Sequence, residues 1–264
     1  MESFLEMPMN RRHVLNAAAV AAAAGLVRRA VGLPLPAAKI EAVAFDGFAI
    51  FDPRPLAVLA EAEYPGKAVA LMALWRARQF EYGWLRTLMR NYANFWQITQ
   101  ESLEFACASL ELTLAADTRD RLMQSFLHLK PWPDVLPVLR RLRSAGIRLA
   151  FLSNLTAAML DANMQGAGIA EFFDTRLSTD AVGAFKPDPR SYQMAVDHFA
   201  LPAAAIAFVA FAGWDAAGAT QFGLPVYWAN RLAQPAEKLG AMPARSSPTL
   251  DELPDFVASY RSSV

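Results

Sequence analysis

The sequence lacks the residues that would form covalent or metal cross-links. Its 264 residues include a single cysteine, Cys107, so no disulfide can form within the chain, and no Cys and His residues have the spacing of zinc ligands. A surplus of charge is also missing, because 25 basic residues balance 25 acidic ones. Without a basic surplus the chain shows no electrostatic signature of nucleic-acid binding, so we expect no nucleic-acid partner.

The apolar run near the N-terminus is too short to cross a membrane. Val14–Val27 has 14 residues, whereas a spanning helix needs about 20. The run lies between two arginine pairs in "RRHVLNAAAVAAAAGLVRRAVGLPLP", an arrangement that resembles a twin-arginine export signal. We therefore expect residues 1–38 to be an export signal and linker, and the protein to be periplasmic. The alternative is an amphipathic or disordered arm on a cytoplasmic protein.

The composition allows a large folded core. Apolar residues make up 55% of the chain and charged residues 19%, which excludes wholesale disorder. Short apolar runs predict buried strands at residues 40–45, 148–154, 205–211 and 225–230. Helical stretches occupy residues 157–166, 189–199 and 216–222, and another helix ends near Gly146. Strands that alternate with helices predict an α/β fold with a doubly wound, Rossmann-like parallel sheet.

A helical insertion separates the first two predicted strands. Residues 68–89 and 98–112 have apolar side chains at helical spacing. We expect residues 54–130 to form a helical cap inserted after the first strand. The Rossmann-like core would then comprise residues 39–53 and 131–264. The C-terminal stretch "MPARSSPTLDELPDF" predicts a loop followed by a short final helix.

Polar side chains follow the predicted strands at the points where those strands end. Asp46 follows the first strand, Ser153 and Asn154 end the second, and Asp215 follows the third, while Lys186 lies in "AFKPDP". Ligands of doubly wound sheets bind outside the carboxyl ends of the strands. Each residue also has an ordinary interpretation: a strand-end Asp caps a helix, a Ser-Asn pair makes a turn, and a lone Lys is solvated.

Taken in order, these residues resemble the haloacid dehalogenase superfamily, and the resemblance covers nearly all of residues 39–264. Phosphatases of the superfamily carry a second acid two residues after the nucleophile, which protonates the leaving group and helps to hold Mg²⁺. Phe48 stands in that position here, and the last motif lacks the acidic pair that completes the metal site. A halide leaves as a stable anion and needs no proton. The resemblance therefore implies carbon–halogen cleavage without a metal or cofactor, and a phosphatase is the less favoured alternative.

The predicted cap strengthens the resemblance. The stretch "LWRARQFEYGWLRTLMRNYANF" is similar to the cap helices of type II (L-2-haloacid) dehalogenases. This likeness implies that Arg76 holds the halide or the substrate carboxylate and that Tyr192 supports Lys186. It also implies an apolar pocket whose walls include Phe48, Phe80, Phe95 and Trp214. For the aromatic residues, ordinary core packing is the alternative.

The family resemblance also implies a mechanism and partners. Asp46 would displace halide from the α-carbon of a short 2-haloalkanoic acid, with inversion, and form an ester. Arg76 and Lys186 would neutralise the substrate carboxylate and the departing halide. Ser153 and Asn154 would donate hydrogen bonds to the carboxylate. Water activated by Asp215 would then release a 2-hydroxy acid. The family's members are commonly dimers, so we expect a homodimer.

Two segments depart from the family pattern. The family has approximately FDxYGTLFD at the nucleophile, whereas this chain has "FDGFAIFD", one residue shorter and without the Thr hydroxyl. In "AFAGWD", Ala210, Phe211 and Ala212 replace the expected Ser, Ser and Asn. The site is therefore divergent and more apolar. The alternative to an active dehalogenase is an impaired homologue that binds a small carboxylate or serves as a structural subunit. Retention of the charged residues favours the enzyme, because unused buried charges are costly.

Overall fold

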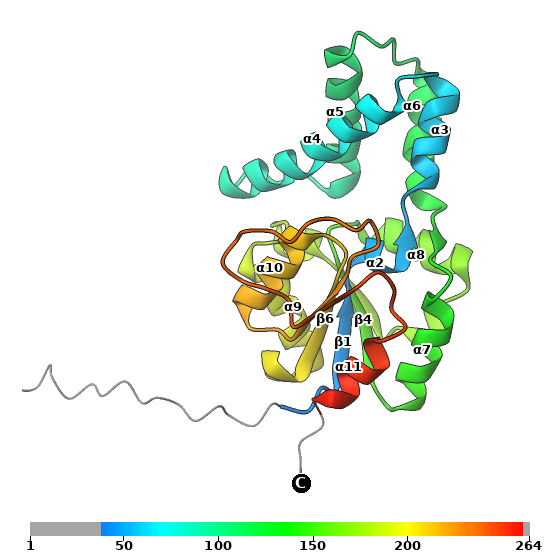
Figure 1. The fold of residues 1–264 in the computed structure, drawn as a ribbon. Helices are drawn as coiled ribbons and strands as arrows, with labels where there is room; N and C mark the ends of the chain where they lie inside the picture. The colour runs from blue at the N-terminus through cyan, green and yellow to red at the C-terminus, as the bar shows by residue number, and fades with distance from the viewer. Residues whose placement is uncertain (1–37, 261–264) are drawn as a thin grey trace, which may run out of the picture. The chain divides into compact units, whose positions relative to one another are not determined.

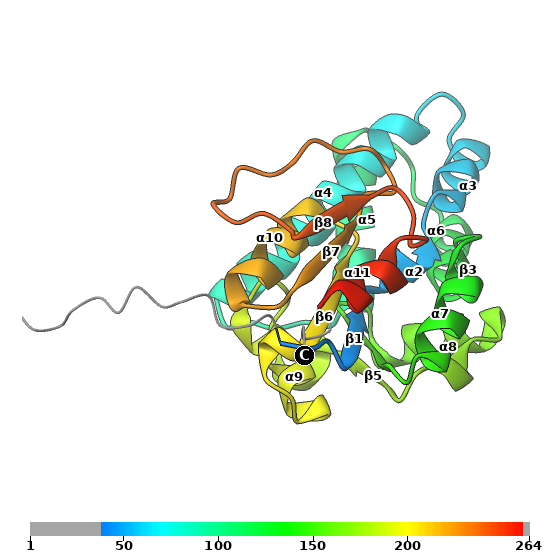
Figure 2. The same cartoon turned by 60° about the horizontal axis from the view of Figure 1, so that its bottom comes forward.

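A computed structural model describes residues 38–260. Its centre is a sheet of parallel strands in the order β5-β4-β1-β6-β7-β8, shown in Figures 1 and 2. The strands are β1 (Ala42–Phe45), β4 (Arg148–Ser153), β5 (Thr175–Ser178), β6 (Ile206–Ala210), β7 (Val226–Ala229) and β8 (Arg245–Ser247). This architecture confirms the predicted doubly wound, Rossmann-like α/β fold.

Helices cover both faces of the sheet. One face packs against α7 (Val135–Ser144), α8 (Ala157–Ala167) and α11 (Leu253–Ser259), and the other against α9 (Pro189–Phe199) and α10 (Gly213–Phe222). Side chains of β1 alternate between the two layers: Val43 and Phe45 lie in the first, Ala42 and Ala44 in the second. A parallel strand buried on both faces must be apolar throughout, which explains the continuous run "AVAF".

The edges of the sheet differ from the sequence prediction. The structure adds β5 at one edge and β8 at the other, where Figure 2 shows it beside β7. The stretch predicted as a loop and helix therefore contains a strand before α11. Thr175–Ser178 and Arg245–Ser247 each have only one buried residue, at their last position. An edge strand need not be an apolar run, so hydrophobic periodicity does not reveal it.

Four helices lie in the insertion between β1 and β4, on one side of the sheet in Figure 1. They are α3 (Pro55–Glu63), α4 (Ala68–Leu88), α5 (Phe95–Ser109) and α6 (Ala116–Gln124). The chain leaves through α2 (Gly47–Ile50) and β2 (Phe51–Asp52) and returns through β3 (Lys130–Pro131), which pairs antiparallel with β2. Short 3-10 turns occupy Ser125–Leu127, Ala170–Phe172, Thr179–Val182 and Ala203–Ala205. The division at residues 54 and 130 stays a prediction.

Helix α4 is tied to the segment that carries Lys186. The indole N–H of Trp84 donates to the Lys186 carbonyl at 3.1 Å, and the Phe185 N–H donates to Oγ1 of Thr87 at 3.0 Å. Gly83 lets the two segments approach, because a Cβ there would lie 3.3 Å from the Phe185 ring. The insertion and the sheet therefore meet next to the predicted site.

The predicted export signal and linker, residues 1–38, lie outside the described residues except for Ala38. Over residues 38–260, no helix combines the length and hydropathy needed to cross a membrane.

Candidate active site

Three buried charged side chains meet at the carboxyl ends of β1 and β6. The Lys186 ammonium donates to Oδ1 of Asp46 at 2.9 Å and to Oδ2 of Asp215 at 2.7 Å. Its third contact is the Leu152 carbonyl, at 3.1 Å. Lys186 is fully buried, and Asp46 and Asp215 are only 8% and 1% exposed. Lys186 comes 140 positions after Asp46 and 29 positions before Asp215, so the charge cluster joins distant parts of the chain.

The strand register fixes the position of Asp46. Phe45 ends β1 level with Phe151 of β4 and Val209 of β6, and the Asp46 N–H donates to the Val209 carbonyl at 2.9 Å. The Asp46 side chain also caps α2, since its Oδ2 accepts from the Phe48 N–H at 2.9 Å. The capping interpretation and the functional one are therefore compatible, because Oδ1 still faces Lys186.

Gly47 lies close to the side chains that follow β4. A Cβ on Gly47 would lie 2.7 Å from Cδ1 of Leu155 and 2.8 Å from Oγ of Ser153. Those distances are shorter than a normal contact, so with a larger residue at position 47 the side chains of Leu155 and Ser153 would have to move. Gly47 therefore suits the close approach of α2 to Ser153.

Asp215 contacts Lys186 and does not cap α10. That helix begins at Gly213, its N-cap is Ala212, and Asp215 lies in the first turn with its carboxylate facing inward. The Tyr192 hydroxyl donates to Oδ1 of Asp215 at 2.7 Å. The expectation that Tyr192 supports Lys186 thus needs correction, because Tyr192 bonds Asp215 and acts on the lysine only through that carboxylate.

Burial and charge set the proton affinities of the cluster. Burial raises the pKa of Asp215 to about 6, although the Lys186 charge and the Tyr192 hydrogen bond act in the opposite direction. Burial acts to lower the pKa of Lys186, but the two carboxylates outweigh it and raise that pKa above its ordinary value. Burial also raises the pKa of Tyr192. Near neutral pH, Lys186 therefore stays protonated.

Ser153 and Asn154 retain free donors. Oγ of Ser153 accepts from the Leu155 N–H at 3.1 Å, which leaves its hydroxyl hydrogen available. Oδ1 of Asn154 accepts from the Lys186 N–H at 3.1 Å and from the Thr179 hydroxyl at 3.4 Å. Within residues 38–260 the Asn154 amide nitrogen has no hydrogen-bond acceptor. Both groups could therefore donate to a ligand, as the sequence predicts.

A small cavity of about 10 Å³ borders Asp46, room for about one water molecule. Its walls include most of the predicted site residues: Asp46, Phe48, Phe80, Phe95, Ser153, Asn154, Trp214 and Asp215. Phe80 and Trp214 are in edge contact, with centroids 5.3 Å apart. Leu155, Phe211 and Ala212 complete the lining. Only the last two stand out in the sequence, as departures from the family motif.

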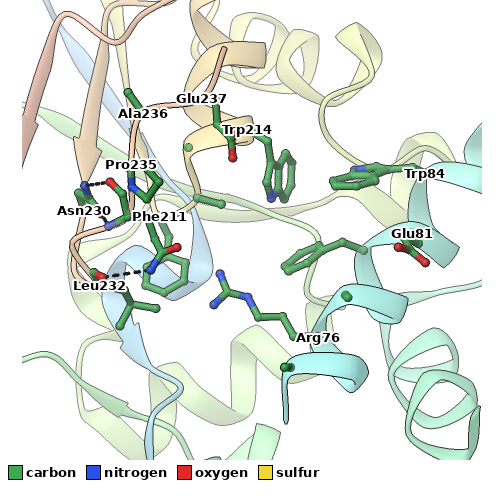
Figure 3. A pocket seen from close by; sticks show the side chains of 16 residues that line it. Arg76, Glu81, Trp84, Phe211, Trp214, Asn230, Leu232, Pro235, Ala236 and Glu237 are labelled. Carbon is green, nitrogen blue, oxygen red and sulfur yellow. Dashed lines mark hydrogen bonds between the residues drawn. The ribbon is translucent and has the colours of Figure 1, made fainter. Parts of the chain in front are cut away.

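Arg76 lies outside that cavity, beyond Phe211. Its guanidinium carbon is 5.6 Å from the Phe211 ring centroid and 5.9 Å from that of Phe80. Figure 3 shows the side chain in an outer cavity of about 440 Å³ that also borders Trp214. Arg76 forms no ion pair with any residue the structure describes. Desolvation lowers the pKa of Arg76, while the Asp46 charge raises it. The structure therefore does not join Arg76 directly to the Asp46–Lys186–Asp215 cluster.

The described residues contain no group of three or more His, Cys, Asp or Glu side chains arranged to hold a metal ion. Lys186 lies between the two carboxylates of the cluster and supplies the positive charge there.

Comparison with known proteins identifies the family and supports the fold. A family model described as haloacid dehalogenase-like hydrolase matches residues 7–223. An (S)-2-haloacid dehalogenase of Pseudomonas sp. strain YL is 40% identical over 205 residues, which cover 77% of this chain and 88% of that protein. A solved L-2-haloacid dehalogenase has a TM-score of 0.81 at 40% identity, covering 83% of this chain and 99% of its own. The L-2-haloacid dehalogenase from Xanthobacter autotrophicus, solved with chloropropionic acid covalently bound, has a TM-score of 0.77 at 32% identity, with coverages of 83% and 98%.

Proposed function

The chain belongs to the haloacid dehalogenase-like hydrolase family, and from that membership we propose that it hydrolyses 2-haloalkanoic acids to 2-hydroxy acids. It is an enzyme of the (S)-2-haloacid dehalogenase type, by its similarity to the relatives above. The observation that carries the proposal is the buried Asp46–Lys186–Asp215 cluster beside an apolar cavity. Short acids are the expected substrates, because the cavity at Asp46 is small.

In the first step, a lone pair of the Asp46 carboxylate attacks C2 of the acid. A C–O bond forms, the carbon–halogen bond breaks with inversion, and the halogen leaves with the bonding pair as halide. Because the leaving group is an anion, no acid is needed at the position of Phe48. Lys186 lies 2.9 Å from the attacking carboxylate and can balance the charge that moves from oxygen to halogen.

In the second step, water attacks the carboxyl carbon of the Asp46 ester. Asp215 takes the proton from that water, and the 2-hydroxy acid departs with the oxygen that Asp46 supplied. Both carboxylates border the same cavity, which has room for about one water molecule. The covalent adduct in the Xanthobacter relative supports an ester intermediate in this chain.

Substrate binding needs a rearrangement of aromatic side chains. Ser153 and Asn154 would donate to the substrate carboxylate, and Arg76 would hold the carboxylate or the halide. Phe80, Phe211 and Trp214 each border both the cavity at Asp46 and the outer cavity at Arg76. A substrate held by Asp46 and Arg76 together would therefore displace at least one of these three rings.

A second candidate is an impaired dehalogenase that binds a small carboxylate or acts as a structural subunit. The observation in its favour is the divergent loop after β6, where Phe211 and Ala212 offer no side-chain hydrogen bond near the ester. A phosphatase is a weaker candidate, because Phe48 cannot protonate a phosphate ester's leaving group.

Halide release by the purified protein tests the proposal. We expect chloride from L-2-chloropropionate and monochloroacetate, and complete loss of release in Asp46→Asn, which removes the nucleophile but keeps the side-chain shape. Chloride electrode or ion chromatography measures the rate. A wild-type protein that releases no halide from any short 2-haloacid would sink the enzyme assignment and favour the second candidate. Phosphate release that requires Mg²⁺ would favour the phosphatase.

We further propose that residues 1–38 direct export to the periplasm through a twin-arginine-type route, and that the protein forms a homodimer. The supporting observation for export is the pair of arginines before the apolar run. Sequencing the N-terminus of periplasmic protein tests the export proposal. A retained Met1 would contradict cleavage, and confinement to the cytoplasm would contradict export.

A further inference from the structure

The single helical turn that carries Asp46 is held by side chains from distant parts of the chain. Helix α2 has only four residues, Gly47–Ile50. A helix that short cannot satisfy its last carbonyl groups internally. Three consecutive carbonyls, those of Phe48, Ala49 and Ile50, accept hydrogen bonds from donors more than 80 residues away in sequence.

Trp132 supplies two of these donors. Its indole N–H donates to the Phe48 carbonyl at 3.0 Å, and its backbone N–H donates to the Ile50 carbonyl, also at 3.0 Å. Arg231 supplies the third donor, because its Nη2 donates to the Ala49 carbonyl at 3.0 Å.

The donor side chains are themselves immobilised. Arg231 pairs with Asp134 at 2.6 Å, and the two side chains are 3% and 10% exposed. Its guanidinium also packs over the Trp132 ring, 4.9 Å from the centroid. Asp134 accepts a further hydrogen bond from the Leu250 N–H. Arg231 is therefore held by an ion pair and a ring contact, and its partner Asp134 is held by a backbone hydrogen bond, although Nε of Arg231 and Oδ1 of Asp134 have no partner among the described residues.

We propose that Trp132 and Arg231 are positioning residues that set the attack geometry of Asp46. The inference rests on the proposed function, in which Asp46 is the nucleophile. The Phe48 N–H donates to the Asp46 carboxylate, and the Trp132 indole donates to the Phe48 carbonyl. Phe48 thus connects Trp132 to Asp46. A shift of α2 therefore moves the carboxylate relative to C2 of the substrate, and attack is sensitive to displacements of about 1 Å.

The decisive variant is Trp132→Phe, which removes the indole N–H and keeps an aromatic ring. With enzyme in excess over L-2-chloropropionate, we expect the rate of ester formation on Asp46 to fall roughly tenfold. The KM should change by less than about twofold, because the groups that would bind the substrate are untouched. Rapid quench followed by intact-protein mass spectrometry measures the ester.

Trp75→Phe is the matched control. The indole N–H of Trp75 in α4 donates to the carbonyl of Thr99 in α5 at 2.8 Å. Trp75→Phe therefore also loses one buried indole–carbonyl hydrogen bond. We expect the two variants to lose a similar amount of thermal stability. Only Trp132→Phe should form the ester more slowly than the wild-type protein. Equal rates in the two variants would overturn the inference.

Arg231→Ala gives an independent readout. Truncation leaves the Ala49 carbonyl without its donor and should slow ester formation at least as much as Trp132→Phe. Millimolar guanidinium, which can occupy the vacated space, should restore part of the rate in this variant and none in Trp132→Phe. The positioning role is overturned if guanidinium does not rescue Arg231→Ala and Trp132→Phe forms the ester at the wild-type rate. A wild-type protein that forms neither ester nor halide would instead refute the proposed function.

Discussion

Burial sets the proton affinity of Asp215 and so sets the pH dependence of the second step. With its pKa at about 6, Asp215 is protonated below that pH and cannot accept a proton from water. In the ester intermediate Asp46 is uncharged, so one of the causes that raise the pKa of Asp215 is removed and the pKa falls below about 6. We predict that ester hydrolysis rises about tenfold per pH unit below this lowered pKa and levels off above it. Decay of the Asp46 ester after a rapid pH jump measures this step alone, and a rate that stays constant down to the lowest pH at which the protein remains folded would exclude Asp215 as the base.

Tyr192 offers a way to shift that pH profile. Its hydroxyl donates to Asp215 at 2.7 Å and stabilises the ionised carboxylate, which lowers the pKa of Asp215. Tyr192→Phe removes this donor, so the pKa of Asp215 should rise and the rising limb of hydrolysis should move to higher pH. Tyr227→Phe is the control, because the Tyr227 hydroxyl donates to the Thr249 carbonyl at 2.7 Å, away from Asp215. An unshifted limb in Tyr192→Phe would contradict the prediction.

At the scale of elements, the loop between β6 and α10 determines how polar the site is. Ala212 is the N-cap of α10 and makes no side-chain cap bond, yet it lines the cavity beside Asp46. Ala212→Asn would place an amide both at the cap and near the ester. We predict faster ester hydrolysis, by roughly tenfold to a hundredfold, because a donor aimed at developing charge stabilises the transition state.

A burst experiment measures this effect. The wild-type protein should show rapid stoichiometric halide release followed by a slower steady rate, and Ala212→Asn should raise the steady rate toward the burst rate. Ala70→Asn, at an exposed position of α4, controls for a general effect of the substitution. If Ala212→Asn leaves the steady rate unchanged, the small side chain at 212 is not what limits hydrolysis.

The elements also show how far sequence reasoning reaches. Apolar runs locate β1, β4, β6 and β7 because these strands are buried on both faces. Polar residues at or after the strand ends then point to Asp46, Ser153 and Asp215. The edge strands β5 and β8 do not form apolar runs and are missed, because each has only one buried residue. The support of α2 escapes for a different reason: Trp132 and Arg231 contact it from 84 and 182 residues away, and no local pattern records such a contact.

At the scale of the whole molecule, the charge cluster depends on long-range assembly. Lys186 meets Asp46 and Asp215 only after the sheet has aligned β1, β4 and β6. The sequence identifies these three residues through a family resemblance, and the fold explains why they converge. The fold also explains why Arg76 is separated from the charge cluster: α4 places its guanidinium against the Phe211 ring. No spacing in the sequence could predict this contact between Arg76 and Phe211.

The proposed homodimer can be argued from the surface of α4. Leu85, Leu88 and Met89 at its C-terminal end are 49%, 79% and 64% exposed, an unusual density of large apolar side chains on one helix end. We expect this patch to be covered by a second copy of the chain. The double variant Leu88→Glu, Met89→Glu should then be monomeric at concentrations where the wild-type protein is dimeric, because two buried carboxylates would face their symmetry mates.

Sedimentation velocity at micromolar concentration distinguishes the two states. Leu239→Glu is the matched control, since Leu239 is 60% exposed in the segment between β7 and β8 and should not affect association. A dimer that survives in the double variant would place the interface elsewhere, and a monomeric wild-type protein would refute the dimer itself. Because α4 also bonds the Lys186 carbonyl through Trp84, we expect the monomeric variant to lose thermal stability at the joint between the insertion and the sheet.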